Sequence, residues 1–267
     1  MRAVGSFVAI GDSFTEGYGD YYPDGSCQGW ADRFARLLAA SAPGLTYANL
    51  AIRGKLLRQI IDEQVPPAVV LRPDLISLAA GGNDLLRPGG DPAALAASFE
   101  QAVAQLRAGG SEVLLFSGFD PVGLPLMRLI RDKCLAYNAR IKDIAARHDC
   151  LHVDLWSMAV LADPREWCAD RLHLAPDGHR RVALHVAEIA GLAVSEDWRT
   201  PLPPDPAGRP NWLRARGQDL HWARAYAAPW IQRRLRGVST GDGLPAKRPD
   251  LLPLPVGASD QCGSITP

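Results

Sequence analysis

The chain has 267 residues, of which 47% are hydrophobic and 22% are charged. This length suffices for one well-buried domain with an added segment, or for two small domains, and the composition is that of an ordinary globular protein. The 29 basic residues balance the 29 acidic residues, so the net charge is about zero. Because general nucleic-acid binding requires a basic surface that neutralises phosphates, the balance argues against nucleic acid as a partner.

The sequence carries no targeting or membrane signal that we can identify. The apolar run within residues 1–13 is too short for a signal peptide, and no small-residue cleavage site follows it. No stretch of about 18 apolar residues is present, so we expect no stable membrane insertion and a cytoplasmic location. The five cysteines are odd in number and lack metal-ligand spacing. The sequence leaves undecided whether Cys27 and Cys168 form a disulfide bridge.

Strands and helices are expected to alternate over the first 194 residues. Short apolar runs predict buried strands at 6–12, 45–52, 74–80, 112–117 and 150–155. Apolar residues at helical spacing, together with Pro and Gly at start and stop positions, predict helices at 28–41, 55–64, 91–108, 128–148 and 176–192. This order requires a five-stranded parallel sheet with helices on both faces, in which ligands bind at the carboxyl ends of the strands.

The composition of the chain changes near residue 195, so we divide it into an N-terminal domain, 1–194, and a C-terminal extension, 195–267. The extension holds 11 of the 22 prolines. Residues 201–210 are typical of a linker, and a helix is expected at about 211–235. One further interpretation is that the extension is an arm that contacts a neighbouring subunit in a homo-oligomer.

Three aromatic residues lie four apart on the predicted extension helix, namely Trp222, Tyr226 and Trp230. One interpretation is an amphipathic helix that binds a partner or a membrane surface. The other, which we favour, is an apolar face packed on the N-terminal domain, because Pro229 interrupts the helix.

Chemistry is expected first at Ser13, which follows the first strand in Gly-Asp-Ser. A serine hydroxyl is a weak nucleophile that requires an adjacent base, and the base requires an orienting acid. Asp170 lies three residues before His173, so its carboxylate can bond Nδ1 of the imidazole within one loop. Nε2 of His173 then remains free to face Ser13. Taken alone, each motif is better explained by a helix cap or a polar loop.

Two further features follow other strands. Gly81-Gly82-Asn83-Asp84 follows the third strand, and the side-chain amide of Asn83 is a candidate oxyanion donor. Gly54 follows the second strand, and its backbone N–H is another candidate donor, as is the N–H of Ser13. Because all these features project to one edge of the sheet, together they indicate acyl transfer with Ser13, Asp170 and His173 as catalytic residues. Residues 1–194 are then the expected catalytic domain.

This pattern resembles the SGNH hydrolases, also called the GDSL-like lipase/acylhydrolase family. Gly11–Gly17 is similar to the family's first block, Gly54 to its second, Gly81 with Asn83 and Asp84 to its third, and Asp170 with His173 to its fifth. The resemblance covers about residues 6–193 and implies a flavodoxin-like three-layer α/β/α sandwich without a metal or organic cofactor. It also implies esterase, lipase, thioesterase or carbohydrate deacetylase activity. The extension is similar to the tails of actinobacterial members.

We therefore expect a serine carboxylester hydrolase that cleaves small soluble acyl esters through an acyl-enzyme. One alternative is an O-deacetylase acting on a carbohydrate or a glycosylated metabolite, and another is a non-catalytic module that binds a partner or membrane through the extension. The segments 14–29 and 118–127 lie on the active side. The first offers tyrosines and acids and the second offers apolar side chains, so the acyl group and the alcohol both stay open.

Overall fold

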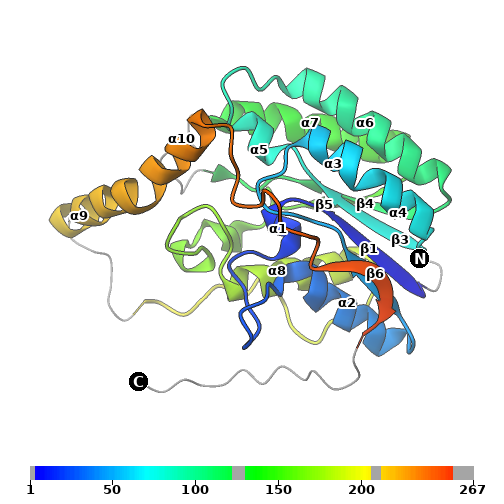
Figure 1. The fold of residues 1–267 in the computed structure, drawn as a ribbon. Coiled ribbons are helices and arrows are strands. Elements are labelled where there is room, and N and C mark those ends of the chain that lie inside the picture. Colours follow the sequence, from blue (N-terminus) through cyan, green and yellow to red (C-terminus); the bar gives the residue numbers. More distant parts are fainter. Residues whose placement is uncertain (1–3, 122–129, 206–211, 255–267) are drawn as a thin grey trace.

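A computed structural model describes residues 4–121, 130–205 and 212–254 of the chain (Figure 1). Its strands form one mixed sheet in the order β5-β4-β3-β1-β2-β6. The strands are β1 (Ser6–Gly11), β2 (Thr46–Asn49), β3 (Leu75–Ala79), β4 (Glu112–Ser117), β5 (Leu151–Asp154) and β6 (Arg248–Pro253). The first five are parallel, and β6 runs antiparallel to β2.

Helices cover both faces of this sheet (Figure 1). One face carries α2 (Gly29–Ser41) and α8 (Pro176–Ile189), and the other carries α3 (Leu57–Glu63), α4 (Val65–Leu71), α6 (Pro92–Ala108) and α7 (Arg131–Arg147). Shorter turns complete the domain: α1 (Ser13–Glu16), α5 (Gly82–Leu85) and two 3-10 turns, Ala159–Ala162 and Pro164–Glu166. The expected layers of helix, sheet and helix are therefore present.

Strand residues alternate between two hydrophobic cores. In β1, Phe7 and Ala9 face the α2/α8 layer, whereas Val8 and Ile10 face the opposite layer. This alternation is the period of two that a strand buried on both faces requires. Both cores are continuous across the parallel strands, which fixes the register of the sheet.

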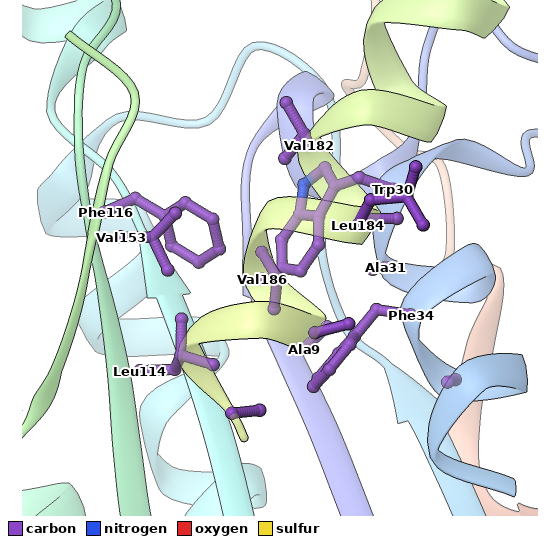
Figure 2. Close-up of a cluster of buried hydrophobic side chains, with 14 of the residues drawn as sticks. Ala9, Trp30, Ala31, Phe34, Leu114, Phe116, Val153, Val182, Leu184 and Val186 are labelled. Carbon is purple, nitrogen blue, oxygen red and sulfur yellow. The ribbon is translucent and has the colours of Figure 1, made fainter. Parts of the chain in front are cut away.

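The α2/α8 core is built by large side chains at helical spacing. Trp30 and Phe34 from α2 lie one turn apart and are both fully buried. They pack against Val182 and Val186 of α8 and Phe116 of β4 (Figure 2). Removing a side chain of this size from water contributes about 2–3 kcal/mol, so this layer holds α2, which follows Ser13 in the chain, against α8, which follows His173.

The predicted five-stranded parallel sheet needs one correction, because the extension contributes β6 as a sixth strand at the edge beside β2. Its sequence, Arg-Pro-Asp-Leu-Leu-Pro, contains Pro249 and Pro253 and leaves most side chains exposed. Such a segment lacks the apolar pattern of a central strand, and proline within a sheet is confined to edges. The sequence of β6 therefore lacks the continuous apolar run that marks the other five strands.

The extension helix expected at about 211–235 is present over residues 212–235. It consists of α9 (Trp212–Trp222), a π-helical turn at Ala223–Ala227 and α10 (Ala228–Leu235). Pro229 does not end the helix, because the widened turn before it changes the hydrogen-bond spacing that a proline would disrupt. Part of the predicted linker at 201–210 lies outside the described residues. Across the described ranges, no helix combines the length and apolar character that crossing a bilayer requires.

Candidate active site

Ser13 lies where the central strand β1 ends. Asp12 caps the one-turn helix α1, and its Oδ1 accepts the N–H of Phe14 at 3.1 Å. Ser13 is thus the first residue of α1, at the carboxyl edge of the sheet. This is the edge at which a parallel α/β sheet places its ligand sites.

Asp170, His173 and Ser13 form a hydrogen-bonded chain. In the loop before α8, Oδ1 of Asp170 accepts the N–H groups of Leu172 at 3.0 Å and His173 at 3.1 Å. Its Oδ2 lies 2.6 Å from Nδ1 of His173, and Nε2 of His173 lies 3.1 Å from Oγ of Ser13. These separations lie within the reach that proton transfer between a nucleophile and its base requires.

The surroundings of Asp170 favour its charged form. Burial opposes ionisation, but the hydrogen bond and charge of His173 and the two loop amides outweigh it and lower the pKa of Asp170. The carboxylate can therefore hold Nδ1–H of the imidazole and stabilise an imidazolium when one forms.

Asn83 and Gly54 lie beside the hydrogen-bonded Asp170, His173 and Ser13. Asn83 is in α5, and its side-chain Nδ2 donates to Oδ2 of Asp12 and to the backbone oxygen of Lys55, both at 3.1 Å. Gly54 has a φ of +77°, which favours glycine. Both residues line one cavity of about 580 Å³ together with Ser13, Asp170 and His173. The structure thus brings the five predicted site residues together.

Asp12 is a member of the site to which the sequence analysis gave no role. Its carboxylate joins Ser13's helix to Asn83, because it accepts from Phe14 with one oxygen and from Asn83 with the other. Burial raises the pKa of Asp12 to about 6. The only sequence signal was its place in Gly-Asp-Ser, which a turn explains equally well.

Tyr18 and Arg53 also border the site. The Tyr18 ring meets the edge of the His173 imidazole, with centroids 4.5 Å apart, and the Arg53 guanidinium lies 4.6 Å from the Tyr18 centroid. Glu16 holds Arg53 through its side chain and accepts the Arg53 N–H at 2.7 Å. Tyr18 lies in the segment 14–29 that was expected to face the site, whereas Arg53 carried no signal in the sequence.

Ser13 and His173 also line a second, smaller cavity of about 150 Å³. We call it the inner cavity, and the larger one the outer cavity. Apolar side chains dominate the inner lining, among them Phe14, Phe116, Phe119, Trp167 and Leu174. Phe119 belongs to the predicted apolar segment 118–127, of which residues 122–127 lie outside the described residues.

The cysteines and the buried histidine near the site do not belong to the hydrogen-bonded group of Ser13, His173 and Asp170. Cys27 and Cys168 are free thiols, so the bridge left open between them is not formed. His179 is fully buried, where it accepts the N–H of Trp30 at 3.2 Å. Burial lowers the pKa of His179 to about 4, which keeps it neutral. Within the described ranges, no three or more His, Cys, Asp or Glu side chains form a cluster that could hold a metal.

Comparisons with solved structures show a common fold. Acetylxylan esterase Axe2 from Geobacillus stearothermophilus is 19% identical, with a TM-score of 0.60 over 75% of this chain and 99% of its own. LAE5, an alpha/beta hydrolase from the metagenome of Lake Arreo, Spain, is 21% identical, with a TM-score of 0.61 over 72% and 97%. TesA is 24% identical, with a TM-score of 0.59 over 69% and 97%. None of the curated proteins compared with the chain matches it.

A family model matches most of the catalytic domain. The match spans residues 9–181, which begins in β1, ends in α8 and includes Ser13, Gly54, Asn83, Asp170 and His173. The family groups lipases and acylhydrolases that share the GDSL motif, so the chain is a serine hydrolase with an esterase or acylhydrolase activity. It belongs to the GDSL-like lipase/acylhydrolase family.

Proposed function

We propose that this chain is a serine carboxylester hydrolase that cleaves small soluble acyl esters through an acyl-enzyme. The observation that carries the proposal is the 3.1 Å separation between Nε2 of His173 and Oγ of Ser13, with Nδ1 held by Asp170. A hydroxyl and an imidazole at this distance can exchange a proton as the hydroxyl attacks a carbonyl carbon.

In the first half-reaction, Oγ of Ser13 bonds to the ester carbonyl carbon while His173 takes the hydroxyl proton. The bond between that carbon and the alcohol oxygen then breaks, and the departing alcohol takes the proton from His173. In the second half-reaction, His173 removes a proton from water, which attacks the acyl-Ser13 carbonyl. The acid leaves, and the proton returns to Ser13.

The oxyanion of each tetrahedral intermediate needs donors that are in place before reaction. We assign this role to the backbone N–H groups of Ser13 and Gly54 and to the side-chain amide of Asn83. The side-chain amide of Asn83 is held in place by its hydrogen bonds to the Asp12 carboxylate and the Lys55 backbone oxygen. An oxyanion would draw one of its two N–H groups away from these acceptors.

The inner cavity supports a short acyl group. At about 150 Å³ with a mainly apolar lining, it suits a short acyl chain better than a long fatty chain. The same observation favours a second candidate function, an O-deacetylase acting on a carbohydrate or a glycosylated metabolite, since acetyl is the smallest common acyl group.

The direct test is hydrolysis of p-nitrophenyl esters from acetate to palmitate by the wild-type chain and by Ser13→Ala. We expect hydrolysis of the shortest esters by the wild type and its loss in the variant. Ser98→Ala serves as a matched control, because Ser98 is half-buried on α6, lines neither cavity and donates to the Ala94 oxygen of its own helix. Acetylated sugars in the same assay separate the second candidate from the first.

Two results would contradict the mechanism. Hydrolysis that survives Ser13→Ala would remove Ser13 from the reaction. If the wild type hydrolysed none of the esters or acetylated sugars, the third interpretation, a non-catalytic binding module, would be favoured instead.

A further inference from the structure

The extension supplies one wall of the outer cavity. Figure 1 shows α9 and α10 beyond the carboxyl ends of the strands, and the segment after α10 running back past α1 to β6. The extension's main contributions to the lining are Trp222, Tyr226, Trp230, Arg233 and the turn at 237–240. This wall faces Ser13 and His173 across the cavity and lies outside the span that matches the family model.

The wall is attached to two of the loops that carry predicted site residues. On the acid–base loop, the indole N–H of Trp222 donates to the Asp170 oxygen at 2.7 Å, and Asp219 pairs with Arg171 at 2.7 Å. On the other loop, Ser239 donates to the Arg53 oxygen at 3.3 Å and packs against Gly54. Because it is anchored at both ends, the wall forms a defined surface of the site.

The extension helix is distorted where it faces the cavity. The π-helical turn at Ala223–Ala227 contains Tyr226, and Pro229 and Trp230 follow at once. Such widened turns within α-helices occur frequently at functional sites. The turn places Tyr226 and Trp230 on the cavity side of the helix, together with Trp222.

The two cavities differ in chemical character, so each suits a different part of an ester. The inner cavity is small and apolar and suits the acyl group. The leaving alcohol must then project from Ser13 into the outer cavity. There it meets aromatic rings from the extension and polar side chains from the catalytic domain and the turn, among them Gln59, Arg87 and Thr240.

We propose that the outer cavity is the alcohol subsite, and that Tyr226 and Trp230 select alcohols with a hydroxylated ring, such as a sugar. This inference rests on the esterase function proposed above. The C–H face of a sugar ring packs on aromatic side chains, while its hydroxyls bond polar groups around it. A plain aryl ring offers these polar groups no hydroxyl to bond, so it gains less from this cavity than a sugar ring does.

The test compares three esters that share an acetyl group and differ in the alcohol, namely a mono-O-acetylated methyl glucoside, phenyl acetate and ethyl acetate. Acid release in a pH-stat gives kcat and KM for each. In Tyr226→Ala and Trp230→Ala, we expect the ratio of kcat/KM for the sugar ester over ethyl acetate to fall about tenfold or more, mostly through KM. Trp230→Phe, which keeps a ring, should recover most of the ratio.

Ile231→Ala is the matched control, because Ile231 lies beside Trp230 on α10 but is 44% exposed and does not line the cavity. It should leave the ratio unchanged. A fall of equal size on all three esters, a larger fall on phenyl acetate, or no acceptance of the sugar ester by an otherwise active wild type would each overturn the subsite. Failure of the proposed esterase function would be recognised separately. Either the wild type would not hydrolyse ethyl acetate, or its hydrolysis would persist in Ser13→Ala.

Discussion

The indole of Trp222 donates its N–H to the backbone oxygen of Asp170 at 2.7 Å, across 52 residues of sequence. The next residue, Arg171, pairs with Asp219 of the same helix, and its guanidinium lies 5.5 Å from the Trp222 ring centroid. Arg171 also has a φ of +55°, a conformation that side-chain-bearing residues rarely adopt. The extension therefore holds the backbone of the loop that aims His173 at Ser13.

Trp222→Phe should weaken this support while it keeps an aromatic ring in the cavity. Loss of one hydrogen bond, worth about 1 kcal/mol, should lower kcat about two- to tenfold through a less constrained Asp170–His173 pair. KM for ethyl acetate should change little. Trp156→Phe is the control, because Trp156 contacts Arg131 and lines neither cavity. An unchanged kcat in Trp222→Phe would show that the hydrogen bond has no part in positioning the loop.

Asn83→Ala tests the oxyanion role. Removal of one such donor commonly lowers turnover by about 10²–10³, with a smaller effect on substrate binding. We expect that loss in kcat on p-nitrophenyl acetate, with residual activity above that of Ser13→Ala. A rise in KM at unchanged kcat would instead assign Asn83 to ground-state binding, and an unaltered rate would remove it from the site.

Asp12→Asn should raise stability at neutral pH. Burial raises the pKa of Asp12 from 3.8 to about 6 in the folded chain, so the folded state disfavours the charged carboxylate. The stabilising effect of the protonated form is complete below about pH 4 and is lost as the pH rises through 6. Above that pH the charge costs about 3 kcal/mol, because one pKa unit corresponds to about 1.4 kcal/mol.

Urea unfolding of the wild type and Asp12→Asn at pH 4 and pH 7.5 checks this expectation. The variant should gain relative stability at pH 7.5 and lose that gain at pH 4. Its kcat should fall, because an amide at position 12 no longer presents a charged acceptor to Asn83. An equal stability difference at both pH values would show that the Asp12 carboxyl does not titrate in this range.

The sequence predicted those features that strong local patterns determine. The five parallel strands were found because both of their faces are buried, as Phe7 and Val8 illustrate on opposite faces of β1. Ser13, Asn83, Asp170 and His173 were found because each follows a strand or precedes a helix in a parallel α/β order. That order brings such positions to one edge.

Features that depend on distant partners could not be predicted. β6 is a strand because β2 offers an open edge, not because of the pattern in its own Pro-containing sequence. Trp222, Tyr226 and Trp230 were recognised as one helical face, but the sequence could not show that this face lines the outer cavity. Arg53 likewise gains its place from Glu16 and Tyr18, which lie more than thirty residues away.

The contact between Gly54 and Ser239 gives a test of how closely the extension is fitted to the catalytic domain. A Cβ at Gly54 would collide with the Ser239 side chain, and the φ of +77° at this position is itself unfavourable for alanine. Gly54→Ala should therefore lose stability from two sources: the collision, and backbone strain of about 1–2 kcal/mol. Adding Ser239→Gly should relieve the collision but leave the strain, so the double variant should recover part of the loss. Urea unfolding of the two single variants and the double variant measures the coupling. Strictly additive effects would mean that Ser239 does not press on Gly54, and that the turn at 237–240 is held by other contacts.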